Sequence, residues 1–166
     1  MRLEREHGPM NPCVPINEAV RHAKGDMIVL TSPEIVHDKP ALYDMLEHYH
    51  DNRDYVAAPC TDPKRGIISG PGSPTGKKRG PMPEGSDFPF CALMSKTLFY
   101  CAGGYDEDYR NGRAFDDNDF LWRLHAAGAN FKHSETRVTH HHEKMKWNMP
   151  SNEPLFRSKW PALFLS

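Results

Sequence analysis

The chain has 166 residues, of which 38% are hydrophobic, so it can bury the core of one compact domain. Lys and Arg number 21 against 22 Asp and Glu, a balance that argues against a broad nucleic-acid or membrane-surface footprint. The four cysteines lack a C-x-x-C pair and no run approaches the roughly 20 apolar residues of a membrane span, so we expect reduced thiols in a cytoplasmic protein without a span or signal peptide.

The first part of the chain alternates between predicted helices and strands. Apolar residues recur at helical spacing over 16–23, and the continuous apolar run 27–30 predicts a buried strand. A second amphipathic helix over 39–52 is followed by a short strand over 54–59. This helix and strand order favours an α/β sheet.

The segment from Cys60 to Asp87 is rich in Gly, Pro, Ser and Lys without an apolar period, and it is predicted to be one long loop. Residues 69–80 look like a phosphate loop, but Pro71 stands where the nucleotide motif needs its first Gly. A flexible basic loop is the simpler interpretation, with Lys77, Lys78 and Arg79 able to close over an anionic ligand.

The second part carries a predicted strand and short helix over 88–104, with Ser95 as the helix N-cap. Another helix is predicted within 114–128, where three acids precede an apolar run that ends at a glycine. Residues 130–144 are predicted to be a strand or extended segment, followed by a short aromatic and apolar tail.

The acids of the helix predicted within 114–128 are Asp116, Asp117 and Asp119. Acids at a helix start accept unpaired backbone N–H groups and complement the helix dipole. Three so close together repel one another, so the third needs a cation, a proton or a catalytic role. On this stretch alone, capping and solvation stand beside catalysis or metal binding as alternatives.

Two further polar groups follow predicted strands. The stretch IVLTSPE delivers Glu34 directly after a strand, and VTHHH ends in three histidines beginning at His140. If both strand ends meet at the ligand edge of a sheet, Glu34 and His140 can share a divalent metal such as Mn²⁺, Mg²⁺ or Zn²⁺. A loop acid and a solvated strand end are the alternatives.

A series of spaced motifs runs from Asn11 to His142: NPCVPINEAVRHAKGD before the strand that ends in SPE, then CAGGYDEDY, FDDNDFLWRL and VTHHH. In this order the motifs resemble the family 2 inverting glycosyltransferases of the GT-A fold. The resemblance implies one GT-A-like α/β domain over residues 1–166, with a truncated Rossmann-like mixed sheet flanked by helices. The N-terminal strands of that family have no counterpart, which implies a fragment, a shortened enzyme, or a homo-oligomer or second chain that completes the nucleoside pocket.

Residue by residue, the resemblance implies that Asp117 is the general base, with Asp116 beside it in the acid pair. Glu34 and His140 resemble the metal ligands, which implies Mn²⁺ or Mg²⁺. Donor and acceptor binding is implied for Ser32, Gly103, Gly104, Tyr105, Asp106, Glu107 and Arg123, with Lys77 and Lys78 of the loop.

The resemblance implies transfer of a sugar from a nucleotide diphosphate sugar to a hydroxyl acceptor, a glycan or another, with inversion. One Asp is then expected to cap the helix, one to orient and one to deprotonate the acceptor. The loop between Thr61 and Asp87 is expected to be a mobile lid beside the site. The alternatives are a non-catalytic binding or interaction module derived from the C-terminal half of the fold, and a metal-dependent hydrolase.

Overall fold

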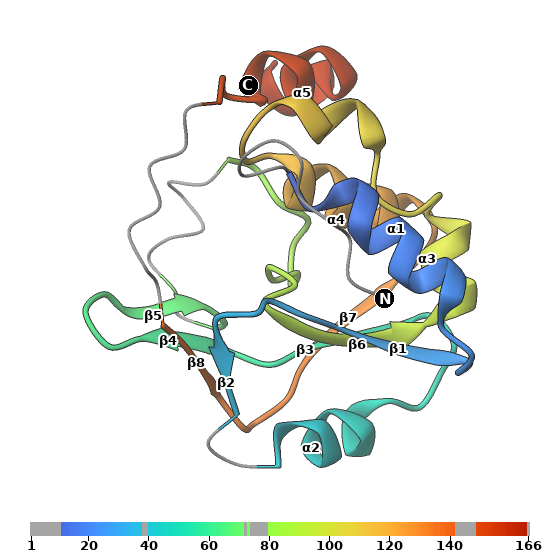
Figure 1. The fold of residues 1–166 in the computed structure, drawn as a ribbon, viewed down its shortest axis with the longest axis vertical. Coiled ribbons are helices and arrows are strands. Elements are labelled where there is room, and N and C mark those ends of the chain that lie inside the picture. Colours follow the sequence, from blue (N-terminus) through green and yellow to red (C-terminus); the bar gives the residue numbers. More distant parts are fainter. Residues whose placement is uncertain (1–10, 38–39, 72, 74–79, 142–148, 166) are drawn as a thin grey trace.

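The computed structural model describes residues 11–37, 40–71, 73, 80–141 and 149–165. The described strands form two four-stranded sheets, a main sheet of order β1-β6-β3-β7 and a second sheet of order β2-β8-β4-β5 (Figure 1). The strands are β1 (Met27–Thr31), β2 (Ile35–Val36), β3 (Asp54–Ala57), β4 (Cys60–Asp62), β5 (Gly66–Ser69), β6 (Cys91–Ser95), β7 (Asn130–His133) and β8 (Val138–His140).

Helices flank the main sheet on both faces, with α1, α3 and α4 on one face, α2 on the other and α5 beyond α4 (Figure 1). Both sheets are mixed, because β3 and β7 are parallel while β6 is antiparallel to its two neighbours, and β8 is parallel to β4 but antiparallel to β2. The predicted α/β fold is therefore confirmed. The helical segments are α1 (Cys13–His22), α2 (Ala41–His48), α3 (Lys96–Cys101), η2 (Glu107–Asn111), α4 (Asp116–Ala126), α5 (Glu153–Lys159) and η3 (Pro161–Phe164).

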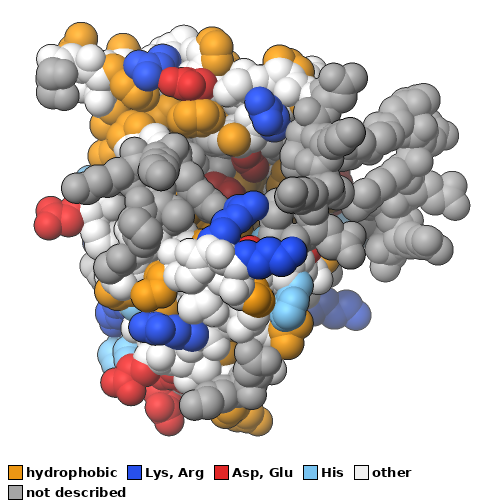
Figure 2. Space-filling model, turned by 90° about the vertical axis from the view of Figure 1, so that its left-hand side faces the viewer, with side chains coloured by type: hydrophobic (Ala, Val, Ile, Leu, Met, Phe, Trp, Pro, Cys, Tyr) orange, Lys and Arg blue, Asp and Glu red, His pale blue; other side chains and the backbone are white. Residues whose placement is uncertain are grey.

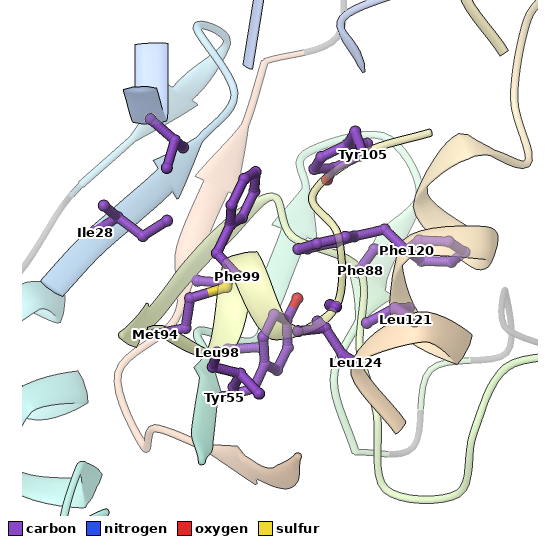
Figure 3. Close-up of a cluster of buried hydrophobic side chains, with 14 of the residues drawn as sticks. Ile28, Tyr55, Phe88, Met94, Leu98, Phe99, Tyr105, Phe120, Leu121 and Leu124 are labelled. Carbon is purple, nitrogen blue, oxygen red and sulfur yellow. The ribbon is translucent and has the colours of Figure 1, made fainter. Parts of the chain in front are cut away.

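Apolar side chains on the two faces of the main sheet form two clusters. All five residues of β6 are buried because both of its faces are covered. Ala92 and Met94 face α1, α3 and α4, in the cluster shown in Figure 3, where Tyr105 stacks on Phe120 with ring centroids 4.3 Å apart. Leu93 faces the opposite cluster beneath α2. Strand β6 thus joins both halves of the core.

Strand β1 differs from the prediction of a buried strand. Ile28 is buried, but Met27 and Val29 are 44% and 38% exposed. Exposed and covered residues alternate along β1, so only the face that carries Ile28 and Leu30 is covered. An apolar run by itself does not reveal how many faces of a strand are buried.

The prediction of one long loop over 60–87 is wrong in its first part. Strands β4 and β5 form an antiparallel hairpin with a register shift next to Cys60. The hairpin escapes a pattern search because its strands are short and contain Thr61, Asp62 and Gly66, which weaken the alternation. The described residues of the segment after Ser69 (70–71, 73 and 80–87) contain no helix or strand, as expected of a loop.

No helix in the described part of the chain is long and apolar enough to cross a membrane.

The predicted N-cap of α3 is confirmed and gives a first test. The hydroxyl of Ser95 accepts a hydrogen bond from the Leu98 N–H at 2.9 Å and donates to the Asn52 carbonyl at 2.7 Å. Ser95→Ala should therefore lower the free energy of unfolding by about 1–3 kcal/mol in urea titrations. Thr97→Ala, at an exposed position of the same helix, should change it by less than about 0.5 kcal/mol. Equal losses would contradict the capping role.

Candidate functional site

The approach to α4 has an unusual backbone. Ala114 and Phe115 have φ of 61° and 66°, in the left-handed region that costs a non-glycine residue about 1–3 kcal/mol. The ring of Phe115 packs against Phe156 with centroids 5.4 Å apart, which helps to hold this conformation. This turn sets the direction of α4 relative to the preceding segment, and with it the position of the acids in the first turn of the helix.

None of the three acids of α4 occupies the N-cap position. Phe115 occupies the N-cap position and makes no side-chain cap hydrogen bond. The carboxylate of Asp116 nevertheless accepts hydrogen bonds from the backbone N–H groups of Asp116 and Asp117, so one Asp partners first-turn donors as expected, but from within the helix and not from the N-cap position. All three acids lie in the first turn of α4, where they still complement the helix dipole.

Asp119 connects α4 to distant segments. Its carboxylate accepts hydrogen bonds from the hydroxyl of Tyr109 at 3.3 Å and from Nε1 of Trp160 at 2.8 Å. Its Oδ2 lies 3.0 Å from Nε of Arg123. Burial raises the pKa of Asp119, although Trp160 and Arg123 act to lower it. Asp119 is thus engaged in holding the fold together.

Asp116 is 7% exposed and lies beside the start of α1. Burial raises the pKa of its carboxyl, the charge of Asp119 raises it further, and a hydrogen bond from Asn11 opposes the change. Burial and the charge of Asp116 also raise the pKa of Cys13 to about 11, so that thiol stays protonated at neutral pH. Asp116 therefore interacts mainly with the packed N-terminus of α1.

Asp117 is the least buried of the three acids. Its side chain is partly exposed, and its Oδ1 accepts a hydrogen bond from the Tyr105 hydroxyl at 3.0 Å. Tyr105 itself is 2% exposed, so this bond holds one carboxylate oxygen in a fixed position. Figure 2 shows acidic side chains recessed in one face of the molecule, near basic side chains. Of the three acids in the first turn of α4, Asp117 is the one that is partly exposed.

The GGYDE turn is held by α1. The side chain of Asn17 accepts a hydrogen bond from the Tyr105 N–H at 2.9 Å and donates to the Tyr105 carbonyl at 2.8 Å and to Glu107 Oε1 at 3.0 Å. Gly103 has a φ of 80°, and a Cβ there would lie 2.7 Å from Nη1 of Arg123. The turn therefore favours glycine for its left-handed backbone, while the end of the Arg123 side chain could move to admit a Cβ.

This turn lines a shallow pocket of about 390 Å³ between α1, α3 and α4. Asp117, the predicted base, does not line this pocket. Tyr105 connects the two, because it lines the pocket and its hydroxyl donates a hydrogen bond to Asp117. The pocket is lined by Asn17, Arg21, Phe99, Tyr100, Gly103, Gly104, Tyr105, Asp106, Glu107 and Arg123.

The predicted metal ligands lie on neighbouring strands. Ile35 of β2 pairs with His140 of β8, and the His141 N–H donates to the Glu34 carbonyl at 3.0 Å. The backbones of Glu34 and His140 therefore lie close together in space. The Ser32 N–H donates to the carbonyl of Phe90, whose ring lies 5.3 Å from the His140 ring. These strand ends are thus tied to the segment that leads into β6.

The residues that the structure describes contain no group of three His, Cys, Asp or Glu side chains that could hold a metal ion. Glu34 and His140 alone are an incomplete ligand set for Mn²⁺ or Mg²⁺, which take six ligands as a rule. His142 of the histidine run lies outside the described residues.

The expected lid is described only in part. Lys77, Lys78 and Arg79 lie outside the described residues. Just after them, the Pro81 carbonyl accepts hydrogen bonds from Asn118 Nδ2 and Trp122 Nε1, both at 3.2 Å. The end of the segment thus contacts α4 one residue from Asp117, beside the candidate site as expected.

Sequence reasoning missed Asp87 and His133. Asp87 Oδ2 lies 3.3 Å from Nε2 of His133, and the Tyr55 hydroxyl donates to the Asp87 carbonyl at 2.9 Å. Burial, then the charges of Asp87 and Asp117, raise the pKa of Tyr55, so both carboxylates lie around this hydroxyl. Neither residue belongs to a recognisable motif. The sequence could have indicated a functional role only through their positions, with Asp87 at the end of the predicted loop and His133 in the predicted extended segment after the helix.

No family model and no curated protein matches the chain. Among solved structures, 34 chains match it in fold. One is the crystal structure of the catalytic domain of Drosophila beta1,4galactosyltransferase 7 in complex with xylobiose, with a TM-score of 0.53 and 16% sequence identity. The match covers 83% of this chain and 57% of that one, so this chain spans little more than half of that structure. The fold, with mixed sheets flanked by helices, is similar to that of a glycosyltransferase catalytic domain.

The buried acids give a pH-dependent prediction. Burial raises the pKa of Asp116 above its ordinary value of 3.8, so its ionised form destabilises the folded state and this cost disappears as pH falls. The wild type should gain stability relative to Asp116→Asn between about pH 7 and about pH 4, measured by urea unfolding at each pH. A constant difference would contradict the buried position of this carboxylate.

Asp54 is the matched control for this measurement. Burial acts to raise the pKa of Asp54, but hydrogen bonds from Lys132 and from the N–H groups of His50 and Asp51 lower it overall. Its carboxylate therefore stabilises the fold above the ordinary value of 3.8, and this stabilisation is lost as pH falls below that value. The wild type should lose its advantage over Asp54→Asn in acid, the opposite of the trend at Asp116.

Proposed function

We propose that this chain is a glycosyltransferase domain that moves a sugar from a nucleotide diphosphate sugar to a hydroxyl acceptor with inversion. The observation that carries the proposal is the partly exposed carboxylate of Asp117 at the start of α4, oriented by the Tyr105 hydroxyl. The fold similarity to a galactosyltransferase catalytic domain supports the same reaction class. We propose that residues 1–166 act as one domain, to which a second chain can add the nucleoside pocket.

In the proposed reaction Asp117 is the general base. The acceptor oxygen attacks the anomeric carbon and transfers its proton to the carboxylate of Asp117, while the bond from that carbon to the diphosphate oxygen breaks. The diphosphate leaves with the bonding electron pair, and the sugar inverts because attack and departure occur on opposite faces. The Tyr105 hydroxyl donates to Oδ1 of Asp117 and so orients the carboxylate that accepts the proton in this proposal.

The remaining candidate residues have supporting roles in this proposal. Asp116 fixes the start of α4 against α1 and acts as a positioning residue. The pocket formed by the GGYDE turn and Arg123 is proposed to bind a sugar ring of the acceptor or donor, with Tyr100, 52% exposed, as a stacking surface. Lys77 and Lys78 are proposed to approach the anionic donor, and Ser32 to lie at its metal side.

A divalent cation, Mn²⁺ or Mg²⁺, remains part of the proposal. Glu34 and His140 are the residues that would hold it, because β2 and β8 bring their backbones together. Bound there, the cation would neutralise charge on the diphosphate. Among the described residues, these two side chains alone are an incomplete ligand set for such a cation.

A non-catalytic binding module is the second candidate. The observation that favours it is the coverage, because the chain matches only 57% of the galactosyltransferase structure. A module of this kind would bind a nucleotide or a glycan at the same edge without turnover.

Asp117→Asn tests the catalytic role directly. The amide keeps the shape of the side chain but does not accept the proton, so transfer should fall about 10²- to 10⁴-fold while donor affinity and the unfolding midpoint stay unchanged. Transfer is measured with a panel of nucleotide sugars and hydroxyl acceptors. Glu47→Gln, on the exposed surface of α2, is the control and should retain full activity. Undiminished transfer by Asp117→Asn would refute the assignment, and nucleotide binding without turnover by the wild type would favour the module.

The metal sites are tested by binding. Mn²⁺ should tighten the binding of a nucleoside diphosphate to the wild type, and Glu34→Gln and His140→Asn should each reduce that gain, because each removes one ligand. Isothermal titration calorimetry with and without Mn²⁺ measures the difference. A gain that persists in both variants would place the cation elsewhere.

A further inference from the structure

A second buried carboxylate lies at the edge that carries Asp117, and the proposed reaction does not use it. Asp87 precedes β6 and is 4% exposed. Its Oδ1 accepts hydrogen bonds from the Ser69 hydroxyl and from the Phe88 N–H, the latter at 3.0 Å, and its Oδ2 lies 3.3 Å from Nε2 of His133. A buried carboxylate is tolerated only with such partners. Oδ2 makes no hydrogen bond within the described part of the chain, so the 3.3 Å contact places the His133 imidazole beside Asp87 without a hydrogen bond between them.

His133 is placed where a ligand would arrive. It is the last residue of β7, which runs parallel to β3, and open α/β sheets bind ligands at the carboxyl ends of their parallel strands. The His133 side chain is 24% exposed, so part of the ring contacts Asp87 and part reaches the surface. No residue in the described part of the chain hydrogen-bonds its Nδ1. That nitrogen is available to a ligand.

The histidine and Asp117 belong to the same edge of the molecule. The hydroxyl of Tyr55 donates to the Asp87 carbonyl at 2.9 Å, and the Tyr105 hydroxyl donates to Asp117 at 3.0 Å. Both tyrosines belong to the cluster in Figure 3, between the main sheet and α4. Two buried tyrosines thus connect the pair of Asp87 and His133 to the proposed base.

The order of the groups argues against nucleophilic catalysis by Ser69. In a catalytic triad the histidine stands between the serine and the acid, so that it can remove the hydroxyl proton. Here the carboxylate of Asp87 stands between Ser69 and His133 and contacts both. The serine is therefore a structural partner of Asp87, and the imidazole is directed elsewhere.

We propose that His133, oriented by Asp87, binds the diphosphate of the nucleotide sugar, an inference that rests on the proposed function. When both ring nitrogens carry protons, Nε2–H pairs with the carboxylate of Asp87 and Nδ1–H donates to a phosphate oxygen. This bond stabilises the negative charge of the departing diphosphate. His133 is then a binding residue and Asp87 its positioning residue.

Titration calorimetry with UDP, GDP, CDP and ADP, and with the matching nucleosides by competition, tests this proposal. His133→Gln should weaken diphosphate binding about 10- to 100-fold and leave nucleoside affinity unchanged, because one charge-assisted hydrogen bond is lost. Asp87→Asn should weaken it less, because the imidazole stays present but less well oriented. His22→Gln, at an exposed position of α1, is the matched control and should bind like the wild type.

The outcomes separate the two proposals. Wild-type protein that binds no nucleoside diphosphate would overturn the proposed function and this inference together. Diphosphate binding that is unchanged in His133→Gln, or weakened equally for the nucleoside, would overturn this inference alone. If His133→Gln does not fold, the imidazole ¹⁵N signals of the wild type decide, since the Nδ1 signal of His133 should shift with UDP, and an unmoved signal overturns the contact.

Discussion

Carboxylates buried in or beside the apolar core need hydrogen-bond or charged partners, and the positions of several strands and helices in this molecule depend on those partners. Asp54 is paired with Lys132 at 2.7 Å, Asp87 with His133, and Asp119 with Arg123. The first two pairs join segments far apart in the sequence, and removal of one partner from a buried pair costs several kcal/mol. The ion pair of Asp54 and Lys132 therefore fixes β7 against β3, in addition to the apolar contacts that drive folding.

The elements with strong local signals were predictable from the sequence. Helix α3 begins where Ser95 provides a cap, and the apolar periodicity of α1 identifies that helix without its neighbours. The hairpin of β4 and β5 was not predictable, because β4 owes its place to a partner far along the chain: Thr61 donates to the Val138 carbonyl across 77 positions. Such pairing leaves no trace in a local pattern. The exposure of β1 follows from the same limitation, since an apolar run does not reveal how many faces of a strand are covered.

Some residues of the candidate site could also be predicted from the sequence, and others could not. The motif containing Asp117 was visible because several acids stand together at a helix start, and the structure separates them by burial and by partner. The sequence gives no means to distinguish Asp119, which bonds Trp160, from Asp117, which meets the surface. Asp87 and His133 are isolated in the sequence, and they acquire a relation to each other only through the meeting of β7 with the segment before β6. The roles of all these residues in turnover remain predictions.

The contact of Trp160 with Asp119 has a consequence for how the domain opens. The C-terminal tail also contacts the core through Phe156, which is fully buried, and through Lys159, which pairs with Asp106 and Asp108. Detachment of the tail would expose apolar surface and at the same time remove a hydrogen bond from a buried carboxylate in α4. The tail and the first turn of α4 are therefore expected to exchange their amide protons as one cooperative unit, so that the end of the chain governs the local stability of the helix start that carries Asp117.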